Sequence, residues 1–247
     1  MIPYIHVGRF SIGTFGLLMV AAFVAAYFVL AADIRRRRLN VPADNIVTAS
    51  ALLGIAGAKL YHVLETPTLL ATDPIGQIFS RAGVAWFGGF IGVLLALYLL
   101  ARNYKITYLS MLDVCSPAAA LGYAVGRIGC LTSGDGDYGK PTSLPWGMSF
   151  PNGLVPTNDK VHPTPIYEAI AAILIFWLLW QLGAKSRRPG YVTAIYLLLM
   201  GIERFLVEFI RVNPRSFFGL TNAQAASLLS IFAGAVILLA CRRSPAY

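Results

Sequence analysis

The chain has 247 residues, of which 57% are hydrophobic and only 13% are charged. Soluble domains carry about 25% charged residues, so this composition excludes an ordinary soluble fold, and the high hydrophobicity excludes a disordered one. The 20 Lys and Arg outnumber the 11 Asp and Glu, which gives a formal net charge of +9. These cations lie between apolar segments and do not collect on one soluble face, which argues against a nucleic-acid partner and for a membrane protein.

Seven apolar segments are long enough to cross a hydrocarbon core of about 30 Å, which takes about 20 residues. We therefore predict an all-α membrane protein with seven transmembrane helices. The helices are expected at residues 10–32, 45–65, 82–101, 107–131, 166–183, 190–212 and 222–241. Residues 1–247 are predicted to form a single transmembrane domain that carries one long loop, at about 132–165.

The orientation follows from the positions of the cations, because cytoplasmic loops carry an excess of Lys and Arg. Eleven of the 20 cations flank the predicted spans on one side, and the other loops carry few. The eleven are Arg35, Arg36, Arg37, Arg38, Arg102, Lys105, Lys185, Arg187, Arg188, Arg242 and Arg243. We predict a cytoplasmic C-terminus, an N-terminus outside, and an outward-facing cap formed by the 132–165 loop.

The three cysteines are Cys115, Cys130 and Cys241, and none of them forms a paired spacing such as Cys-x-x-Cys. Such isolated cysteines predict neither a disulfide framework nor a zinc site. An alternative for Asp135, Asp137 and Asn152 is a calcium site, but the glutamate that closes an EF-hand loop is missing downstream. We expect no metal and no cofactor.

Arg127 is the strongest single candidate for function. Ionisable side chains inside a membrane are costly, so they usually face the bundle interior and serve a function. Arg127 lies near the outer end of the fourth predicted span between Gly126 and Gly129, and glycines allow close approach of a backbone. The alternative is an arginine at a helix end whose charge reaches the membrane surface. Cys130, three residues on, is either a thiol beside a cation or a small buried apolar residue.

The sixth predicted span carries a second charged group. Arg204 and Glu208 are four residues apart and therefore share a helical face, and Arg211 follows three residues after Glu208. One interpretation is a ladder of ion pairs that neutralises itself. The other is that Glu208 orients Arg204, whose planar guanidinium suits a phosphodiester.

Polar residues also occur on other spans. Lys59 and His62 lie on the second span, Asp113 lies early in the fourth, and His162 precedes the fifth. A lone histidine is either a hydrogen-bonded structural residue or a base. The pair Gly88 and Gly89 opens the third span, where small residues permit either tight helix packing or a lipid headgroup beside exposed backbone N–H groups.

Four blocks of the chain together resemble the prolipoprotein diacylglyceryl transferase family. The order and spacing of the blocks agree, and the resemblance covers nearly the whole chain. The blocks are Gly88-Gly89-Phe90-Ile91-Gly92, Gly126-Arg127-Ile128-Gly129, His162-Pro163-Thr164-Pro165-Ile166-Tyr167-Glu168 and Arg204-Phe205-Leu206-Val207-Glu208-Phe209-Ile210-Arg211.

This resemblance implies an enzyme of the bacterial inner membrane. It would transfer the diacylglyceryl group of phosphatidylglycerol to the lipobox cysteine thiol of a prolipoprotein and release glycerol 1-phosphate. The resemblance assigns phosphate binding and leaving-group stabilisation to Arg127 and Arg204, and orientation of Arg204 to Glu208. We also expect a set of residues to contact substrate: Lys59, Gly88, Gly89, Asp113, Gly126, Gly129, Cys130, Asp135, Tyr167 and Arg211.

The chain departs from the family pattern at several positions. Phe87 stands where the family has a histidine before the glycine pair, Cys130 replaces an asparagine, Asp135 replaces a glutamate, and Met200 replaces an aromatic hydroxyl. His62 or His162 is then the expected base. The alternative is a phospholipid-binding or lipid-transport protein without catalysis, or a transferase with a different acceptor.

Overall fold

The computed structural model describes residues 1–65, 85–185 and 188–243. Residues 82–84 of the third predicted span and Arg187 lie outside the described residues. The chain divides into two compact units, one made of Met1–Asp33 and Asp113–Tyr247 and the other of Ile34–Leu112. We call them the first and the second unit. The prediction of a single domain stays a prediction.

A helix occurs at each of the seven predicted positions. Their bounds are α1 Thr14–Arg37, α2 Ala43–Glu65, α5 Trp86–Asn103, α6 Tyr108–Ser133, α7 Thr164–Lys185, α8 Tyr191–Val207 and α9 Asn222–Arg243. Five of them, α1, α2, α6, α7 and α9, are long and apolar enough to cross a membrane, and the apolar part of α5, Phe87–Asn103, is shorter. The chain is therefore a mostly helical membrane protein.

The predicted helix 190–212 is wrong at its C-terminal end, because α8 stops at Val207. The backbone then tightens: Phe209 donates to the carbonyl of Leu206 at 3.2 Å, and Arg211 to that of Glu208 at 3.3 Å. These i→i+3 bonds belong to turns and short 3₁₀ segments. Arg211 thus leaves the helix axis, and its side chain is free to reach other elements.

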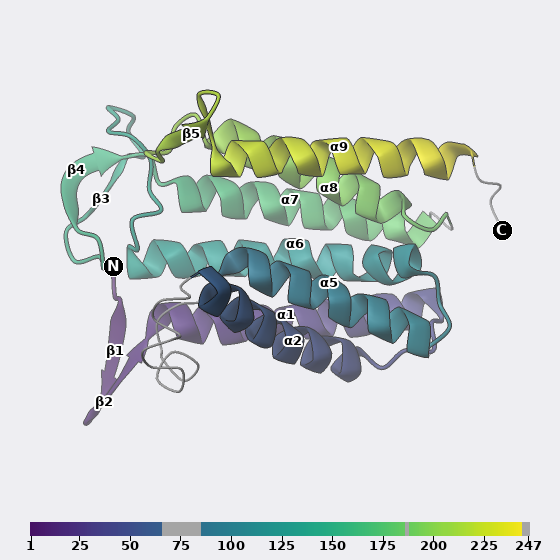
Figure 1. The fold of residues 1–247 in the computed structure, drawn as a ribbon. Coiled ribbons are helices and arrows are strands. Elements are labelled where there is room, and N and C mark those ends of the chain that lie inside the picture. The colour runs from purple at the N-terminus through teal and green to yellow at the C-terminus, as the bar shows by residue number, and fades with distance from the viewer. Residues whose placement is uncertain (66–84, 186–187, 244–247) are drawn as a thin grey trace. The chain divides into compact units, whose positions relative to one another are not determined.

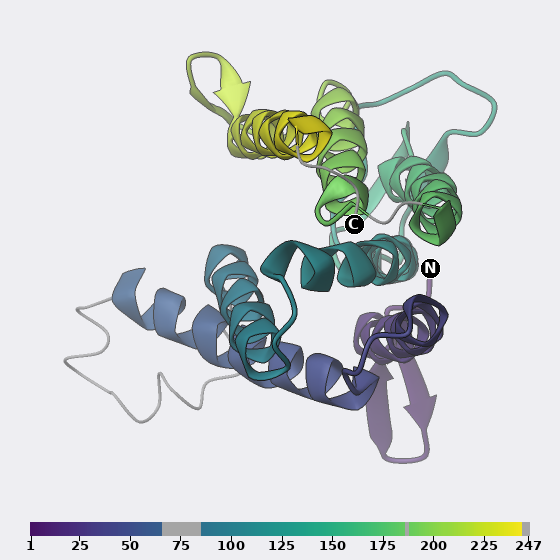
Figure 2. The ribbon, with the colours of Figure 1, turned by 90° about the vertical axis from the view of Figure 1, so that its right-hand side faces the viewer.

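The second unit is built on the antiparallel pair α2 and α5, which lie side by side (Figure 2). Glycines line the contact: a Cβ placed on Gly88 would collide with the carbonyl oxygen of Gly57, and one on Gly92 with that of Leu53. Small residues let two helix backbones approach closely, which is how apolar helices pack in a membrane. Gly88 is buried in this contact. The geometry of Gly88 is therefore that of helix packing.

The first unit packs α6, α7 and α8 around a small apolar core made of Ala120, Ile175, Leu179 and Val192. Helix α9 lies against α8, and the two backbones come close where a Cβ on Gly234 would lie 2.8 Å from the carbonyl oxygen of Ala194. Helix α1 contacts α6 through Gly122, whose Cβ would meet Ala22 and Ala26.

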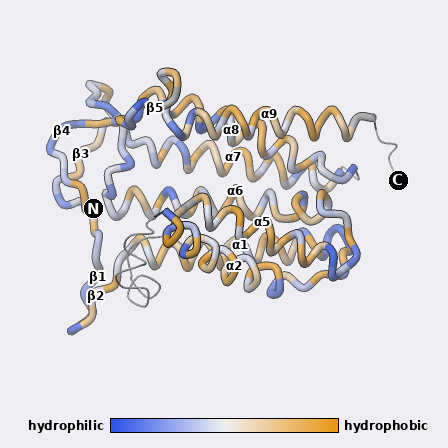
Figure 3. Tube along the Cα trace, in the orientation of Figure 1, coloured by the Kyte–Doolittle hydropathy of each residue, from blue (hydrophilic) through white to orange (hydrophobic). Residues whose placement is uncertain are grey.

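Three short antiparallel hairpins lie near one end of the first unit (Figure 1). They pair β1 Tyr4–Val7 with β2 Phe10–Gly13, β3 Met148–Phe150 with β4 Thr157–Val161, and β5 Arg215–Phe217 with β6 Leu220–Thr221. The long segments of the helices are hydrophobic, and hydrophilic residues concentrate in the connections at the helix ends (Figure 3). The hairpin end of this unit is where the charged side chains described next converge.

Candidate functional site

Three arginines and three carboxylates form the candidate site, which we call the arginine cluster. Helix α6 supplies Arg127 near its end and the loop after it supplies Asp137, α7 supplies Glu168 in its first turns, and the end of α8 with the following turn supplies the other three. The members of the cluster are Arg127, Asp137, Glu168, Arg204, Glu208 and Arg211.

Glu168 lies at the centre of the arginine cluster, and its side chain is fully buried. Its Oε1 accepts a hydrogen bond of 2.9 Å from the Tyr123 hydroxyl and lies 3.2 Å from Arg127 Nη2 and 3.5 Å from Arg204 Nη1. Its Oε2 lies 3.7 Å from Arg211 Nη1. A buried carboxylate is tolerated only where paired charges and hydrogen bonds offset its lost hydration. Glu168 therefore holds three guanidiniums together.

Asp137 bridges the outer side of the same cluster. Its two carboxylate oxygens pair with Arg127 and with Arg211, and its backbone carbonyl accepts hydrogen bonds from Arg211 and from the Thr164 hydroxyl. Burial on its own would raise the pKa of Asp137, but the hydrogen bond and charge of Arg211, together with Arg127, outweigh it and hold the pKa below its usual value. Asp137 is therefore ionised at neutral pH.

The loop that carries Asp137 needs glycine at two positions. Gly134 has φ +59° and Gly136 has φ +95°, in the left-handed region that side chains rarely adopt. A Cβ on Gly134 would also lie 2.7 Å from the Cα of Gly153 in the neighbouring loop. Because the turn is tight, the chain folds back on itself after α6. The carboxylate of Asp137 therefore lies beside Arg127 at the end of that helix.

Glu208 is a second carboxylate that holds Arg204 and Arg211 in place. Its Oε2 lies 2.8 Å from Arg204 Nη1, which is the pair expected from the i,i+4 spacing, and 3.6 Å from Arg211 Nε. Its Oε1 accepts a hydrogen bond of 2.6 Å from Asn213. Side-chain exposure is 13% for Arg127, 21% for Arg204 and 7% for Arg211. The cluster is thus a partly buried set of guanidiniums, and Arg204 is the most accessible of the three.

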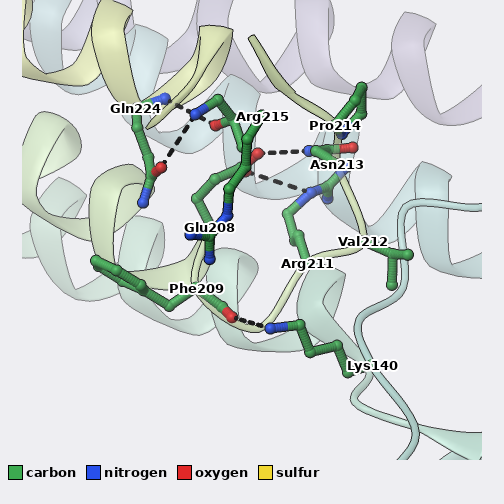
Figure 4. Close-up of a pocket in the computed structure, with 10 residues that line it drawn as sticks. Lys140, Glu208, Phe209, Arg211, Val212, Asn213, Pro214, Arg215 and Gln224 are labelled. Carbon is green, nitrogen blue, oxygen red and sulfur yellow. Dashed lines mark hydrogen bonds and ion pairs between the residues drawn. The ribbon is translucent and has the colours of Figure 1, made fainter. Parts of the chain in front are cut away.

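A cavity of about 350 Å³ adjoins the cluster on the side of α9 (Figure 4). Glu208 and Arg211 belong to both the cluster and the cavity wall, and Arg215 and Gln224 complete the wall from the C-terminal segment. Lys140 also lines it and donates a hydrogen bond of 2.9 Å to the carbonyl of Phe209. Guanidiniums and an ammonium on one wall suit an anionic group.

The cluster does not suit a metal ion. Cys130, Asp135 and Asp137 place potential ligand atoms within 4.8 Å of one another. Both Asp137 oxygens are already held by arginines, and the same guanidinium charges repel a cation. Arg127 Nη1 lies 4.0 Å from the sulfur of Cys130. The donor set is therefore suited to an anion.

The two glycines beside Arg127 face α1. A Cβ on Gly129 would lie 3.3 Å from the Phe15 ring, and the nearest atom to one on Gly126 is the Met19 sulfur, at 4.0 Å. These glycines let α6 and α1 pack closely. Their geometry supports helix packing beside the site, while Arg127 itself turns toward Glu168.

Asp113 is engaged far from the arginine cluster along the same helix. Its carboxylate accepts 2.7 Å hydrogen bonds from the backbone N–H and the hydroxyl of Thr193, and one of 2.8 Å from the N–H of Gly190. These groups begin α8, so Asp113 satisfies donors at a helix N-terminus. It precedes Arg127 by 14 residues, about 21 Å along α6. This geometry gives Asp113 a structural role.

His162 and Tyr167 form a separate aromatic group. The Tyr167 hydroxyl lies 3.3 Å from His162 Nδ1 and accepts a hydrogen bond of 2.8 Å from Trp146 Nε1.

Asp135 accepts a hydrogen bond from the backbone of Asp137, at 3.2 Å. The residue of this loop that pairs with the arginines is Asp137, and a role of Asp135 in substrate contact stays a prediction.

Four of the predicted site residues, Lys59, His62, Gly88 and Gly89, belong to the second unit. Of these, Gly88 packs against Gly57, and a Cβ on Gly89 would meet Ala58 at an ordinary 3.5 Å. The roles of Lys59 and His62 in a site stay predictions.

Sequence reasoning did not place Tyr123, Asp137 or Glu168 beside the arginines. A signal existed for Tyr123, which precedes Arg127 by four residues and therefore shares its helical face; the Arg127 guanidinium lies 4.9 Å from its ring centre. Glu168 also had one, as an acid at the start of an apolar span. Asp137 had none, because a tight loop determines where it points.

Comparisons with known proteins agree on one family. A sequence model of prolipoprotein diacylglyceryl transferase matches residues 3–240. A phosphatidylglycerol–prolipoprotein diacylglyceryl transferase of Polynucleobacter necessarius is 36% identical, over 87% of this chain and 84% of its own. Relatives with the same name from Chromohalobacter salexigens and Clostridium tetani are each 33% identical, over 98% and 89% of this chain and 92% and 89% of theirs.

Proposed function

This chain belongs to the prolipoprotein diacylglyceryl transferase family, and we propose that it transfers the diacylglyceryl group of phosphatidylglycerol to the cysteine thiol of a prolipoprotein. The observation that carries the proposal is the arginine cluster, in which Glu168 gathers Arg127, Arg204 and Arg211 at one end of the first unit. The relatives' names supply the two substrates.

We infer a membrane arrangement from the charge pattern. All seven helices span the bacterial inner membrane, the N-terminus and the hairpin end face outward, and the C-terminus is cytoplasmic. The support is the excess of cations, Arg35–Arg38 among them, at the helix ends that are predicted to be cytoplasmic. The arginine cluster then lies near the outer surface, at the depth of lipid phosphates.

The chemistry required is a displacement at carbon. The acceptor thiolate attacks the glyceryl carbon of the lipid, the bond from that carbon to a phosphate oxygen breaks, and glycerol 1-phosphate leaves with the electron pair. Negative charge grows on the departing phosphate, so cations already held in position stabilise the transition state. Arg127 and Arg204 are the groups proposed to contact this phosphate, with Glu168 and Glu208 fixing the direction of their guanidiniums.

The phosphate must compete with a carboxylate already present. Asp137 pairs with Arg127 and Arg211 in this structure. A phosphodiester has two charged oxygens that suit the same guanidinium geometry. Lipid binding is therefore proposed to move Asp137 away from at least one of its two arginines.

The test is a reconstituted reaction. The purified protein is incubated with phosphatidylglycerol and a lipobox peptide, and mass spectrometry detects peptide that has gained a diacylglyceryl group. A peptide with its cysteine replaced by serine serves as the control. Absence of product, with lipid still bound in an Arg127-dependent way, would establish the alternative of a lipid-binding protein without transferase activity.

A further inference from the structure

Four carboxylates lie within electrostatic reach of the arginines, and one of them differs from the rest. Asp137, Glu168 and Glu208 each pair with at least one guanidinium. Both oxygens of Glu203 are buried and accept no hydrogen bond from any residue that the structure describes. A buried polar group without a partner is rare in folded proteins and marks a strained or functional position.

Glu203 lies on the inner face of α8. The residues one and two turns earlier on that face, Leu199 and Tyr196, pack against the core formed with Ala120 of α6 and Leu179 of α7. With 3.6 residues per turn, Glu203 continues this line by one more turn. Its side chain therefore lies between the apolar core and the site. A carboxylate there does not contribute to apolar packing.

The neighbours of Glu203 are the residues of the site itself. The charges of Glu168 from α7, of Arg127 from α6, and of Arg204 and Arg211 from α8 and the turn after it all act on its carboxylate. Tyr123 of α6 is a further titratable neighbour. Glu203 also immediately precedes Arg204 in the chain. A thiol that approaches a lipid phosphate held by Arg204 therefore comes close to Glu203.

We propose that Glu203 is the catalytic base that accepts the proton of the acceptor thiol, an inference that rests on the transferase function proposed above. The paired carboxylates are poor candidates: Oε2 of Glu168 and of Glu208 also accepts no hydrogen bond, but each lies within 4 Å of a guanidinium, whose charge disfavours a proton there. The Glu203 oxygens have free lone pairs.

The step balances without a further reactant. The thiol proton moves to a Glu203 oxygen as the sulfur bonds to the glyceryl carbon, and the carbon–oxygen bond to the phosphate breaks with its electron pair on the leaving group. Glu203 then gives the proton to an oxygen of the departing phosphate, which restores its carboxylate and yields the monoanion of glycerol phosphate.

The test compares transfer by the wild type and by Glu203→Gln at pH 7 and at pH ~9.5. General bases contribute about 10²- to 10⁴-fold, so Glu203→Gln is expected to lose that much turnover at pH 7. A free thiol has a pKa near 8.5 and ionises unaided at the higher pH, so the deficit should shrink there by at least about tenfold. Binding of phosphatidylglycerol should be unchanged, and Tyr196→Phe, on the same face of α8, serves as the matched control.

The outcomes separate the two proposals. A wild type without product contradicts the transferase function. An active wild type with a Glu203→Gln variant of similar rate, or with a deficit that does not change with pH, overturns the role of Glu203 alone. If Glu203→Gln does not fold, Glu203→Ala replaces it: added formate should restore part of its turnover, and no restoration in a folded variant overturns the proposal.

Discussion

The first unit gathers four of its predicted site residues, Arg127, Arg204, Glu208 and Arg211, into a charged cluster, whereas in the second unit the predicted Gly88 lets two helices pack closely. In the arginine cluster, Glu168 has three guanidiniums around it. In the α2–α5 pair, Gly88 has the backbone of Gly57 against it. Both groups come from blocks that resemble one family. A sequence motif shared with a family can therefore mark residues of a reactive site or residues that pack helices together. The contacts of each residue in the structure show which of the two applies.

The largest expected effect on stability comes from a substitution at the centre of the arginine cluster. Glu168→Gln leaves three guanidiniums without their shared buried counter-charge, and breaking such a buried set costs about 4 kcal/mol. We expect a loss of that size in the free energy of unfolding, measured by denaturation in detergent micelles. The exposed Glu65→Gln serves as the control. A loss below about 1 kcal/mol would show that Glu168 does not hold the cluster together.

The next effect tests packing in the second unit. Gly88→Ala places a methyl group against the carbonyl of Gly57 and the Cβ of Tyr61, so we expect destabilisation of about 3 kcal/mol. Gly89→Ala is the matched control, because its methyl group would meet Ala58 at 3.5 Å. Thermal unfolding of both variants measures the difference. If both variants stay stable but lose lipid binding, the glycine pair contacts the headgroup and the comparison fails.

Asp113 offers a contrast within the first unit. Asp113→Ala leaves the Gly190 and Thr193 donors at the start of α8 without an acceptor, at an expected cost of about 2 kcal/mol in unfolding free energy. Turnover per folded molecule should be unchanged, because the carboxylate caps a helix. A variant that is stable but has a raised KM for lipid would show that Asp113 contributes to substrate binding.

The smallest expected effect concerns Asp137, and it depends on pH. Its lowered pKa means that the ion pairs with Arg127 and Arg211 stabilise the fold fully above the ordinary carboxyl value of about 3.9. This contribution disappears as the pH falls below that value and through the folded-state pKa. Asp137→Asn should therefore cost about 1 kcal/mol at pH 7 and flatten the acid limb of the stability curve.

Asp135→Asn is the natural comparison for that measurement. Its side chain accepts the backbone N–H of Asp137, which an amide oxygen can also do, and no ion pair with an arginine is found for it among the described residues. We expect its acid limb to follow that of the wild type. An Asp135 variant with the flatter curve would mean that Asp135, and not Asp137, is the partner of the arginines.

The sequence predicted the helices well because apolar length and the positions of cations depend on local composition. It also predicted the pair of Arg204 with Glu208, since both lie on one regular helix. It did not predict the end of α8 at Val207, because tight turns there replace an otherwise favourable helical pattern. The place of Asp137 depends on two left-handed glycines and on a distant loop, which no local pattern specifies.

The same reasoning applies to residues whose contacts differ from those expected in a substrate site. Gly88 and Asp113 have the residue types of a binding site, but a helix backbone contacts the first and a helix N-terminus the second. Glu203 shows the reverse: no local pattern sets it apart in the sequence, and its distinction is that neither carboxylate oxygen accepts a hydrogen bond from the described residues. These differences arise from tertiary contacts.

The most direct test of the central claim is the rate of diacylglyceryl transfer by Arg127→Lys, relative to the wild type and to the control Arg9→Lys. An ammonium keeps the charge but not the planar pair of donors that faces Glu168 and the phosphate. The account predicts product with the wild type and with Arg9→Lys, and a loss of about 10²-fold or more in kcat/KM with Arg127→Lys. Near-normal turnover by a folded Arg127→Lys would contradict it.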